Sequence, residues 1–172
     1  MTEQVGPVVE RIEASRFVPA GVPAILAVLR DPDGHVAVDA SGMLQSADGT
    51  VVRAVGDDFV VHMDREALGD LPMGRYDVRV IITAFDEPAS PDGTARVEWT
   101  IEGMVRPPIG HVFGHVLEPV DEGTRVTSYC DWSGAREEWK PIFPVIDAKA
   151  LRASLGLLER AVLRGYPRPL VG

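Results

Sequence analysis

The stretch from Asp147 to Arg164 constrains the fold more than any other part of the chain. Its apolar residues recur at alternating steps of three and four, so they lie along one stripe of an α-helix, and charged residues occupy most of the other side. Asp147 is a favoured helix N-cap, and Gly165 is a favoured residue just beyond a helix end. A helix this amphipathic has to pack on a broad apolar surface. The stripe consists of Ala148, Leu151, Leu155, Leu158 and Val162.

Most of the chain before this helix has the pattern of β-strands. The segment 95–102 alternates cleanly, with Val97, Trp99 and Ile101 on one face and polar residues on the other. Three turns that contain Asp-Gly or Glu-Gly connect alternating segments, which predicts an antiparallel sheet with one apolar face. The expected strands are 8–14, 43–46, 50–63, 75–85, 95–102, 111–118 and 124–132.

One shorter helix is expected early in the chain. Apolar residues have helical spacing over 22–29, Pro23 suits the first turn, and Asp31-Pro32 ends the pattern. We expect 16–21 to be a linker and 33–35 to be a turn. A sheet of this many twisted strands curls, and the last helix would lie in the curl. The predicted class is α+β, a curved antiparallel sheet wrapped around a long C-terminal helix.

Size and charge limit the partners. A chain of 172 residues suits one domain over 1–172, with its structured core at about 8–164. The net charge of −9 argues against nucleic acid or an anionic membrane surface as the main partner. No apolar run approaches the ~20 residues that span a bilayer, and the first residues lack the features of a signal peptide. We therefore expect a cytoplasmic protein with no membrane insertion.

Several short motifs occur in an order that resembles the START/Bet v 1-like helix-grip superfamily (SRPBCC), in particular its polyketide cyclase/dehydrase and lipid-transport-like branch. The resemblance runs from about residue 8 to residue 164, and the ordered set is specific for the fold rather than for a chemistry. The chain departs from the branch pattern at Val36-Ala-Val38, where an aromatic residue is frequent, and at Phe113 and His115, where Trp and Tyr are common. The motifs are 31–35, 55–59, Trp99, 117–119, 123–127 and 131–132, followed by the last helix.

The resemblance implies a cavity between the concave sheet face and the last helix, suited to a small hydrophobic molecule that is lipid-like or polyketide-like. The alternative is that the same side chains simply fill a core. The apolar loops 104–110 and 139–145 are candidates for a gate, or for packing over one end of the core. The candidate lining residues are Phe59, Val61, Met63, Val78, Val80, Trp99, Ile101, Phe113, His115, Trp139, Phe143, Leu151, Leu155 and Leu158.

His115 is the polar residue of most interest on this face. If Leu117 is buried, a period of two places Phe113 and His115 on the same face. A buried imidazole can orient a carbonyl or act as an acid or base, or it can be a core residue with its hydrogen bonds satisfied. His115 and Tyr76 are the catalytic candidates if the chain is a polyketide cyclase, aromatase or dehydratase. The third alternative is an interaction module with a filled core and no cavity.

We expect no metal and no cofactor. His111 and His115 are four strand residues apart, roughly 13 Å, which is too far for one zinc ion. No Gly-rich phosphate loop occurs in the sequence. Cys130 is the single cysteine, which excludes an internal disulfide, and it has no basic neighbour in sequence to activate its thiol. The sequence leaves open a homodimer formed through an exposed strand edge.

Overall fold

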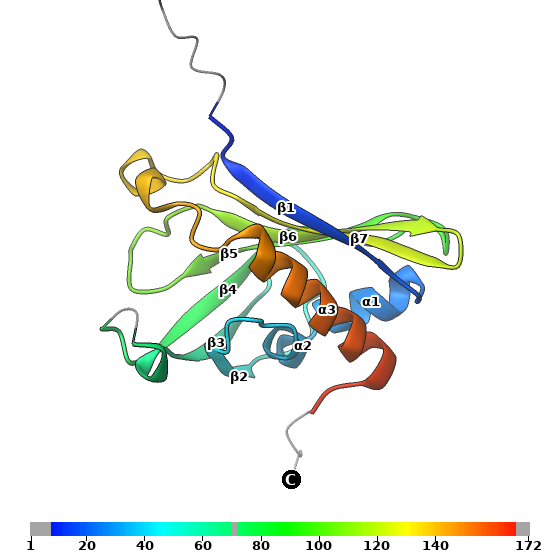
Figure 1. Ribbon diagram of the computed structural model, residues 1–172, viewed down its shortest axis with the longest axis horizontal. Coiled ribbons are helices and arrows are strands. Elements are labelled where there is room, and N and C mark those ends of the chain that lie inside the picture. The colour runs from blue at the N-terminus through cyan, green and yellow to red at the C-terminus, as the bar shows by residue number, and fades with distance from the viewer. Residues whose placement is uncertain (1–7, 70–71, 168–172) are drawn as a thin grey trace, which may run out of the picture.

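The computed structural model describes residues 8–69 and 72–167. Its strands form one antiparallel sheet in the order β1-β7-β6-β5-β4-β3-β2 (Figure 1). The sheet is curved but not closed, so β1 and β2 are its two edges. The strands are β1 (Arg11–Val18), β2 (Leu44–Asp48), β3 (Asp58–Asp64), β4 (Arg75–Asp86), β5 (Ala95–Glu102), β6 (Val112–Val120) and β7 (Gly123–Asp131).

In the part of the chain that the structure describes, three α-helices cover one face of the sheet (Figure 1). The helices α1 (Val22–Leu29) and α2 (Pro32–Ala37) follow β1, and α3 (Ala148–Arg164) ends the described chain (Figure 1). Two short 3-10 helices, η1 (Glu66–Leu68) and η2 (Glu137–Ile142), lie in connections. Within 8–69 and 72–167, no helix is long and apolar enough to cross a membrane.

The helix predicted from the stripe is confirmed, together with its caps. The Asp147 carboxylate accepts a hydrogen bond from the backbone N–H of Ala150 at 2.8 Å, which satisfies a donor that the helix itself cannot. Gly165 follows the helix with φ of 75°, a conformation that favours glycine. Leu151, Leu155 and Leu158 are buried. Each fully buried leucine side chain stabilises the fold by about 1.5–3 kcal/mol.

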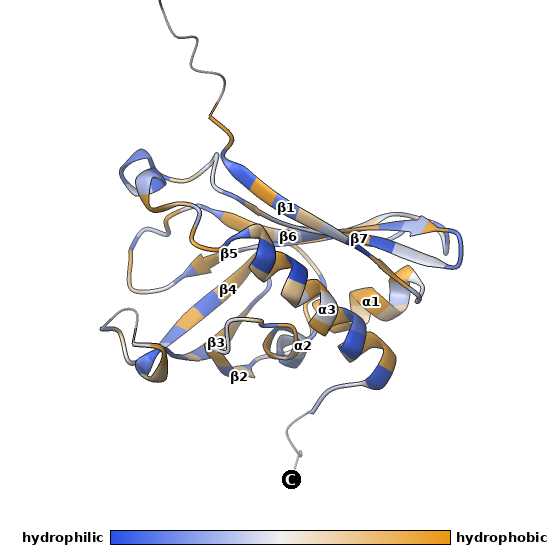
Figure 2. Cartoon of the chain, in the orientation of Figure 1, coloured by the Kyte–Doolittle hydropathy of each residue, from blue (hydrophilic) through white to orange (hydrophobic). Residues whose placement is uncertain are grey.

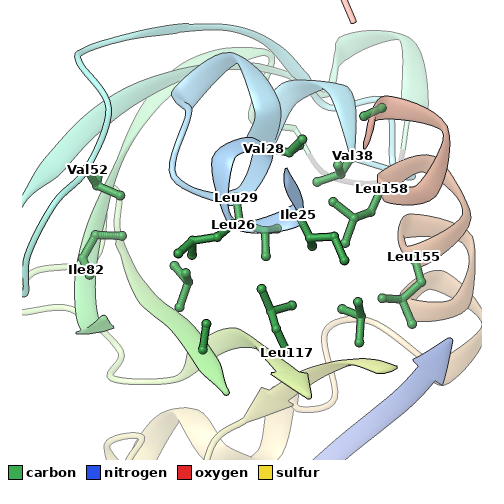
Figure 3. Close-up of a cluster of buried hydrophobic side chains, with 14 of the residues drawn as sticks. Ile25, Leu26, Val28, Leu29, Val38, Val52, Ile82, Leu117, Leu155 and Leu158 are labelled. Atoms are coloured by element: carbon green, nitrogen blue, oxygen red, sulfur yellow. The ribbon is translucent and has the colours of Figure 1, made fainter. Parts of the chain in front are cut away.

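The main core lies between the helices and the sheet (Figure 3). Ile25 and Leu29 of α1 and Leu155 and Leu158 of α3 pack in one cluster with sheet residues such as Leu117. The hydropathy colouring shows the reason for the arrangement: α1 is hydrophobic over most of its surface, whereas hydrophobic and charged positions alternate along α3 (Figure 2). A helix as hydrophobic as α1 has to bury most of its surface, and the amphipathic α3 can pack against it while its charged side stays exposed.

Two segments of the N-terminal region differ from expectation. The first strand is Arg11–Val18 and not 8–14, so the expected linker at 16–21 is wrong at its start. Pairing explains the extension, because β1 pairs with β7 along its whole length and Ser15 bonds Thr127 at 2.9 Å. The predicted turn at 33–35 is also wrong, since these residues belong to α2.

The predicted hairpin that joins 43–46 to 50–54 is wrong as well. β2 pairs with β3 directly, and residues 49–57 form a loop. One Asp57 carboxylate oxygen accepts hydrogen bonds from the N–H groups of Arg53 and Ala54 at 2.7 and 3.1 Å, which closes the loop on itself. Val52 N–H also donates to the Arg30 carbonyl at 2.9 Å, so the segment pairs with the end of α1 instead of with a strand.

Candidate functional site

The concave face of the sheet divides into a covered half and an open half. Under α1 and α3, side chains such as Ile82, Val97 and Leu117 are fully buried. Farther along the same strands, the apolar side chains of this face are only partly buried. We call this second part the open half, and it consists of Met63, Tyr76, Trp99, Ile101 and Phe113.

Aromatic rings gather around Trp99, at the boundary between the two halves. The imidazole of His35, on α2, makes edge contacts with Trp99 at 4.7 Å and with Phe59 at 4.9 Å. On β6, Phe113 and His115 lie nearly parallel to the Trp99 ring, at 6.2 and 5.6 Å between centroids. Such offset and edge arrangements are the favourable ones for aromatic pairs. The rings of α2, β3, β5 and β6 therefore form one continuous group.

The aromatic row continues from Phe113 toward the loops. His111 makes an edge contact with Phe113 at 5.3 Å and a tilted contact with Phe143 at 4.9 Å. Phe143 in turn stacks on Trp132 at 5.6 Å. Trp132 belongs to a second apolar cluster, separate from the main core, which also includes Cys130 and Ala135. The row thus connects the deep end of the sheet to the segment before α3.

Three histidines lie in this row, and all are uncharged at neutral pH. His35, His111 and His115 are exposed by only 6, 8 and 5 %. Burial disfavours the imidazolium form, and it lowers the pKa to about 4 for His35, about 4 for His111 and about 3 for His115. His35 Nε2 donates to the Leu29 carbonyl at 2.7 Å. For His111 Nδ1 and His115 Nδ1, the described residues supply no hydrogen-bond partner.

The structure distributes the predicted lining residues over both halves. Trp99, Ile101, Met63 and Phe113 lie in the open half, and Phe143 reaches the row from the segment after η2. Trp139 is partly buried in η2 and belongs to neither apolar cluster of the described residues. The remaining predicted residues are buried: Phe59, Val61, Val78, Val80, His115, Leu151, Leu155 and Leu158.

The two catalytic candidates do not lie close together. His115 pairs with Val97 of β5, and Val97 pairs with Phe85 of β4. Tyr76 lies nine positions along β4 from Phe85, or about 30 Å at the usual rise per strand residue. A small substrate therefore cannot contact both side chains, and their pairing in one reaction is not supported.

Surface hollows occur outside the core of the described residues. One, of about 510 Å³, lies mainly on the convex side of β3 and β4: His62, Asp64, Arg75 and Asp77 alternate with Met63 and Tyr76 of the open half, and Gln45 completes the wall. The other, about 280 Å³, lies between α1 and the segment after β4, with Leu26, Arg30 and Glu87 in its wall. Neither hollow has a residue of α3 in its wall. Over 8–69 and 72–167, no group of three or more residues is arranged to hold a metal ion.

The two loops that were candidates for a gate pack on the same apolar cluster. Ile109 and Phe143 both contact the Trp132 cluster, and Arg136, three residues before the second loop, donates its N–H to the Ile109 carbonyl at 2.8 Å. The tips of the two loops are exposed: Met104 is 68 % and Ile142 49 % exposed. Each loop therefore has a packed base and an exposed apolar tip, at the end of the sheet where the open half lies.

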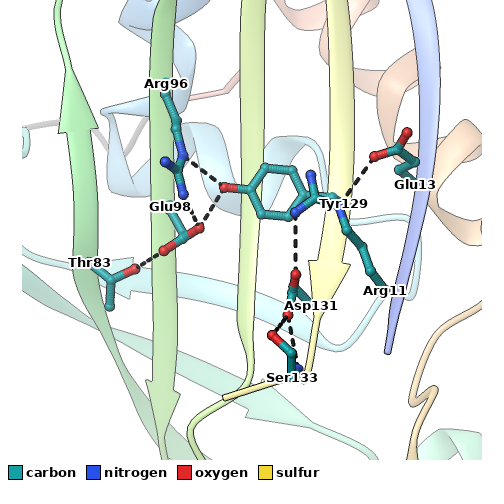
Figure 4. A network of polar contacts seen from close by, with 8 residues as sticks. All are labelled: Arg11, Glu13, Thr83, Arg96, Glu98, Tyr129, Asp131 and Ser133. Atoms are coloured by element: carbon teal, nitrogen blue, oxygen red, sulfur yellow. Dashed lines mark hydrogen bonds and ion pairs between the residues drawn. The ribbon is translucent and has the colours of Figure 1, made fainter. Parts of the chain in front are cut away.

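The convex face carries a network of hydrogen bonds and ion pairs around Tyr129 (Figure 4). Tyr129 donates to the Glu98 carboxylate at 2.6 Å and accepts from Arg96 Nε at 3.1 Å, and the Arg11 guanidinium lies 3.9 Å above its ring. Tyr129 is on the predicted outward face but is only 1 % exposed, because these neighbours cover it. Burial and the Glu98 carboxylate raise the pKa of Tyr129 to about 12. Every residue drawn in Figure 4 has a hydrogen-bond or ion-pair partner.

Three members of the aromatic row were not among the predicted lining residues: His35, His111 and Trp132. His35 was assigned to a turn, and only its place on α2 directs its ring at Trp99. His111 was considered only as a metal ligand. A usable signal existed for His111, because a period of two from His115 and Phe113 places it on the same face.

Comparison with known proteins identifies the fold. No family model matches the chain, and no curated protein matches its sequence. Among solved structures, norcoclaurine synthase from Thalictrum flavum is similar over 95 % of this chain and 99 % of its own, with 17 % identity and a TM-score of 0.55. Major latex-like protein 151 from Panax ginseng is similar over 89 % of this chain and 97 % of its own, with 14 % identity and a TM-score of 0.54. An AHSA1-like protein from Aeromonas hydrophila is similar over 92 % of this chain and 99 % of its own, with 14 % identity and a TM-score of 0.55. The expected resemblance is thus confirmed for the fold: the chain has the helix-grip architecture of the SRPBCC/Bet v 1-like proteins.

Proposed function

We propose that the protein binds a small hydrophobic molecule, lipid-like or polyketide-like, on the open half of the concave face. The observation that carries this proposal is the partial burial of Met63, Trp99, Ile101 and Phe113 on a face whose other half is fully covered. Apolar side chains that converge on a concave surface beside a few polar groups are typical of small-molecule sites.

Proteins of this fold accommodate small molecules. A point mutant of norcoclaurine synthase, similar to this chain over 93 % of its length with 18 % identity and a TM-score of 0.53, was solved in complex with a transition state analogue. That similarity is in the fold alone, so it supports a small-molecule site in this architecture and not the same reaction.

Binding without committed catalysis is better supported than a cyclase, aromatase or dehydratase activity. The separation of Tyr76 from His115 removes the pair of polar groups that such an activity was expected to use. A pKa of about 3 also makes His115 a weak base at neutral pH, since efficient general bases have a pKa near the working pH. An interaction module remains the other alternative, and it predicts no bound small molecule.

The test is a titration with N-phenyl-1-naphthylamine, an uncharged probe that fluoresces in apolar surroundings. We expect the wild type to bind it, and Ile101→Glu to weaken binding about tenfold or more, because a carboxylate would lie in the open half. Leu163→Glu is the matched control, since Leu163 is 51 % exposed on α3 and outside the site. Equal binding by both variants, or no binding by the wild type, would count against the proposal. Mass spectrometry of an organic extract of the purified protein would identify a natural ligand that is retained.

A further inference from the structure

His115 and Ser128 form a polar position on an otherwise apolar face. They are cross-strand partners on β6 and β7, and both are buried, at 5 and 4 % exposure. Directly opposed residues on one face of a sheet have Cβ atoms about 4.5–5.5 Å apart. Of the inner-face side chains that β3 to β6 contribute to the described residues, from Phe59 to Leu117, none is Asp, Glu, Lys or Arg. On these four strands a ligand therefore meets neutral side chains only.

His115 has unused hydrogen-bonding capacity. Its Nδ1 is buried and has no partner among residues 8–69 and 72–167. A buried polar atom without a partner is unfavourable, and native proteins seldom leave one unless it serves a purpose. The imidazole also lies nearly parallel to Trp99, at 5.6 Å between centroids and 22°, and the Trp99 ring reaches the open half. Trp99 is therefore the side chain through which a ring bound in the open half would lie next to His115.

A charged group is poorly suited to this position. A carboxylate needs a cation or several donors to offset the loss of water. The neutral imidazole of His115 offers at most one N–H, and the single N–H of His35 is already donated to the Leu29 carbonyl. An ammonium group would need a buried carboxylate, which the inner face of β3 to β6 lacks in the described chain. A hydroxyl fits better, because it can both donate and accept and so suits either tautomer of His115.

We infer that His115 selects an uncharged, hydroxyl-bearing aromatic ligand, whose ring packs beside Trp99 and Phe113 and whose hydroxyl bonds the imidazole. This inference rests on the proposed function and narrows it, since it favours a phenolic, polyketide-like molecule over a fatty acid. His115 acts here as a residue that determines specificity, and no reaction step is assigned to it.

The experiment compares three probes with the same bicyclic ring: naphthalene, 2-naphthol and 2-naphthoate. At pH 7.5 the hydroxyl of 2-naphthol stays protonated, as that of tyrosine does, while the carboxylate is charged. We expect the wild type to bind 2-naphthol about tenfold more tightly than naphthalene, as one good hydrogen bond allows, and 2-naphthoate more weakly than naphthalene. Isothermal titration calorimetry measures all three.

Two variants assign the preference to His115. His115→Phe should lose the preference for 2-naphthol over naphthalene, as measured by the ratio of the two affinities. His115→Asn, which keeps a hydrogen-bonding group near the position of Nδ1, should retain part of the preference. A wild type without preference for 2-naphthol, or a His115→Phe variant that keeps it, overturns the inference and leaves the proposed function standing if naphthalene binds. Failure of all three probes to bind the wild type overturns both. If His115→Phe does not fold, two other results test the inference: the ratio of the wild-type affinities for 2-naphthol and 2-naphthoate, and the preference that His115→Asn retains.

Discussion

Lowering the pH from 7.5 to 5 should destabilise this protein strongly, and three buried histidines are the reason. His35, His111 and His115 have folded-state pKa values of about 4, 4 and 3, against 6.5 for an unperturbed histidine. Above pH 6.5 each group is neutral in both states, so the full stability is present. Below pH 6.5 the unfolded chain binds protons that the folded chain does not, and stability falls until the folded pKa is reached.

The size of the loss follows from the same values. At pH 5 an unfolded histidine is 1.5 pH units below its pKa, and each unit corresponds to about 1.4 kcal/mol. Each histidine therefore costs about 2 kcal/mol, and the three together cost about 6 kcal/mol at this pH. A domain is typically stable by about 5–15 kcal/mol, so the protein should be close to unfolding.

Other groups titrate differently. His62 donates to Asp48 and Asp77 on the convex face, and these bonds raise its pKa, so its contribution is present at low pH and is lost as the pH rises. It partly offsets the loss between pH 7.5 and 5. Hydrogen bonds lower the pKa of the carboxyls of Glu98 and Asp131, so their contribution is lost only below the usual range of carboxyl pKa values, about 4. Between pH 6.5 and 4, the change in the free energy of unfolding is therefore due to the buried histidines.

The assay is urea unfolding at several pH values from 7.5 to 5, followed by circular dichroism. We expect the free energy of unfolding to fall by up to about 6 kcal/mol in the wild type, reduced by the contribution of His62, and by about 2 kcal/mol less in His115→Phe. The single variant is the control, because it removes one titrating group and leaves His35 and His111 in place. A free energy of unfolding that stays constant over this range would refute the assignment of these histidines as buried and neutral.

Three further substitutions test the fold. Gly114→Ala should lower the melting temperature markedly, because a Cβ there would lie 2.3 Å from the Tyr129 ring; an unchanged melting curve would contradict the packing of that ring. Asp147→Ala should cost about 1 kcal/mol of unfolding free energy in urea through loss of the cap to Ala150, while Asp147→Asn, which keeps a capping oxygen, should cost less. Leu155→Ala should cost about 2–5 kcal/mol in the same assay, since Leu155 is completely buried, and a loss below 1 kcal/mol would exclude its place in the core.

Elements whose signals are local could be predicted from the sequence, and those that depend on distant partners could not. The last helix needs only its own stripe and Asp147, and it occurs where expected. The turn expected at 33–35 is a helix because Asp31 accepts from Asp33 N–H at 3.1 Å and His35 bonds the Leu29 carbonyl. The second of these contacts comes from a different helix, which no local pattern reveals.

The same distinction applies to the site. The period of two placed Trp99, Phe113 and His115 on one face correctly, because alternation is a property of each strand. The division of that face into a covered and an open half depends on where α1, α2 and α3 lie on the sheet, and the sequence contains no short-range signal for this. Tyr76 and His115 were paired for the same reason, since position along the sheet is set by the register of three strands.

The composition of the aromatic row argues that it does more than fill space. On β6 and just before it, Phe113 alternates with His111 and His115, and all three side chains face the same apolar surroundings. A phenyl ring fits such a position without an unpaired nitrogen, whereas each imidazole here leaves one at a cost of about 1–3 kcal/mol. Because each histidine is buried and neutral, it also lowers the free energy of unfolding at acidic pH. A core selected for stability alone would gain from Phe at both positions, so His115→Phe should be at least as stable as the wild type at pH 7.5. A variant that gains stability and loses its preference for a hydroxyl would show that stability has been exchanged for recognition at this position.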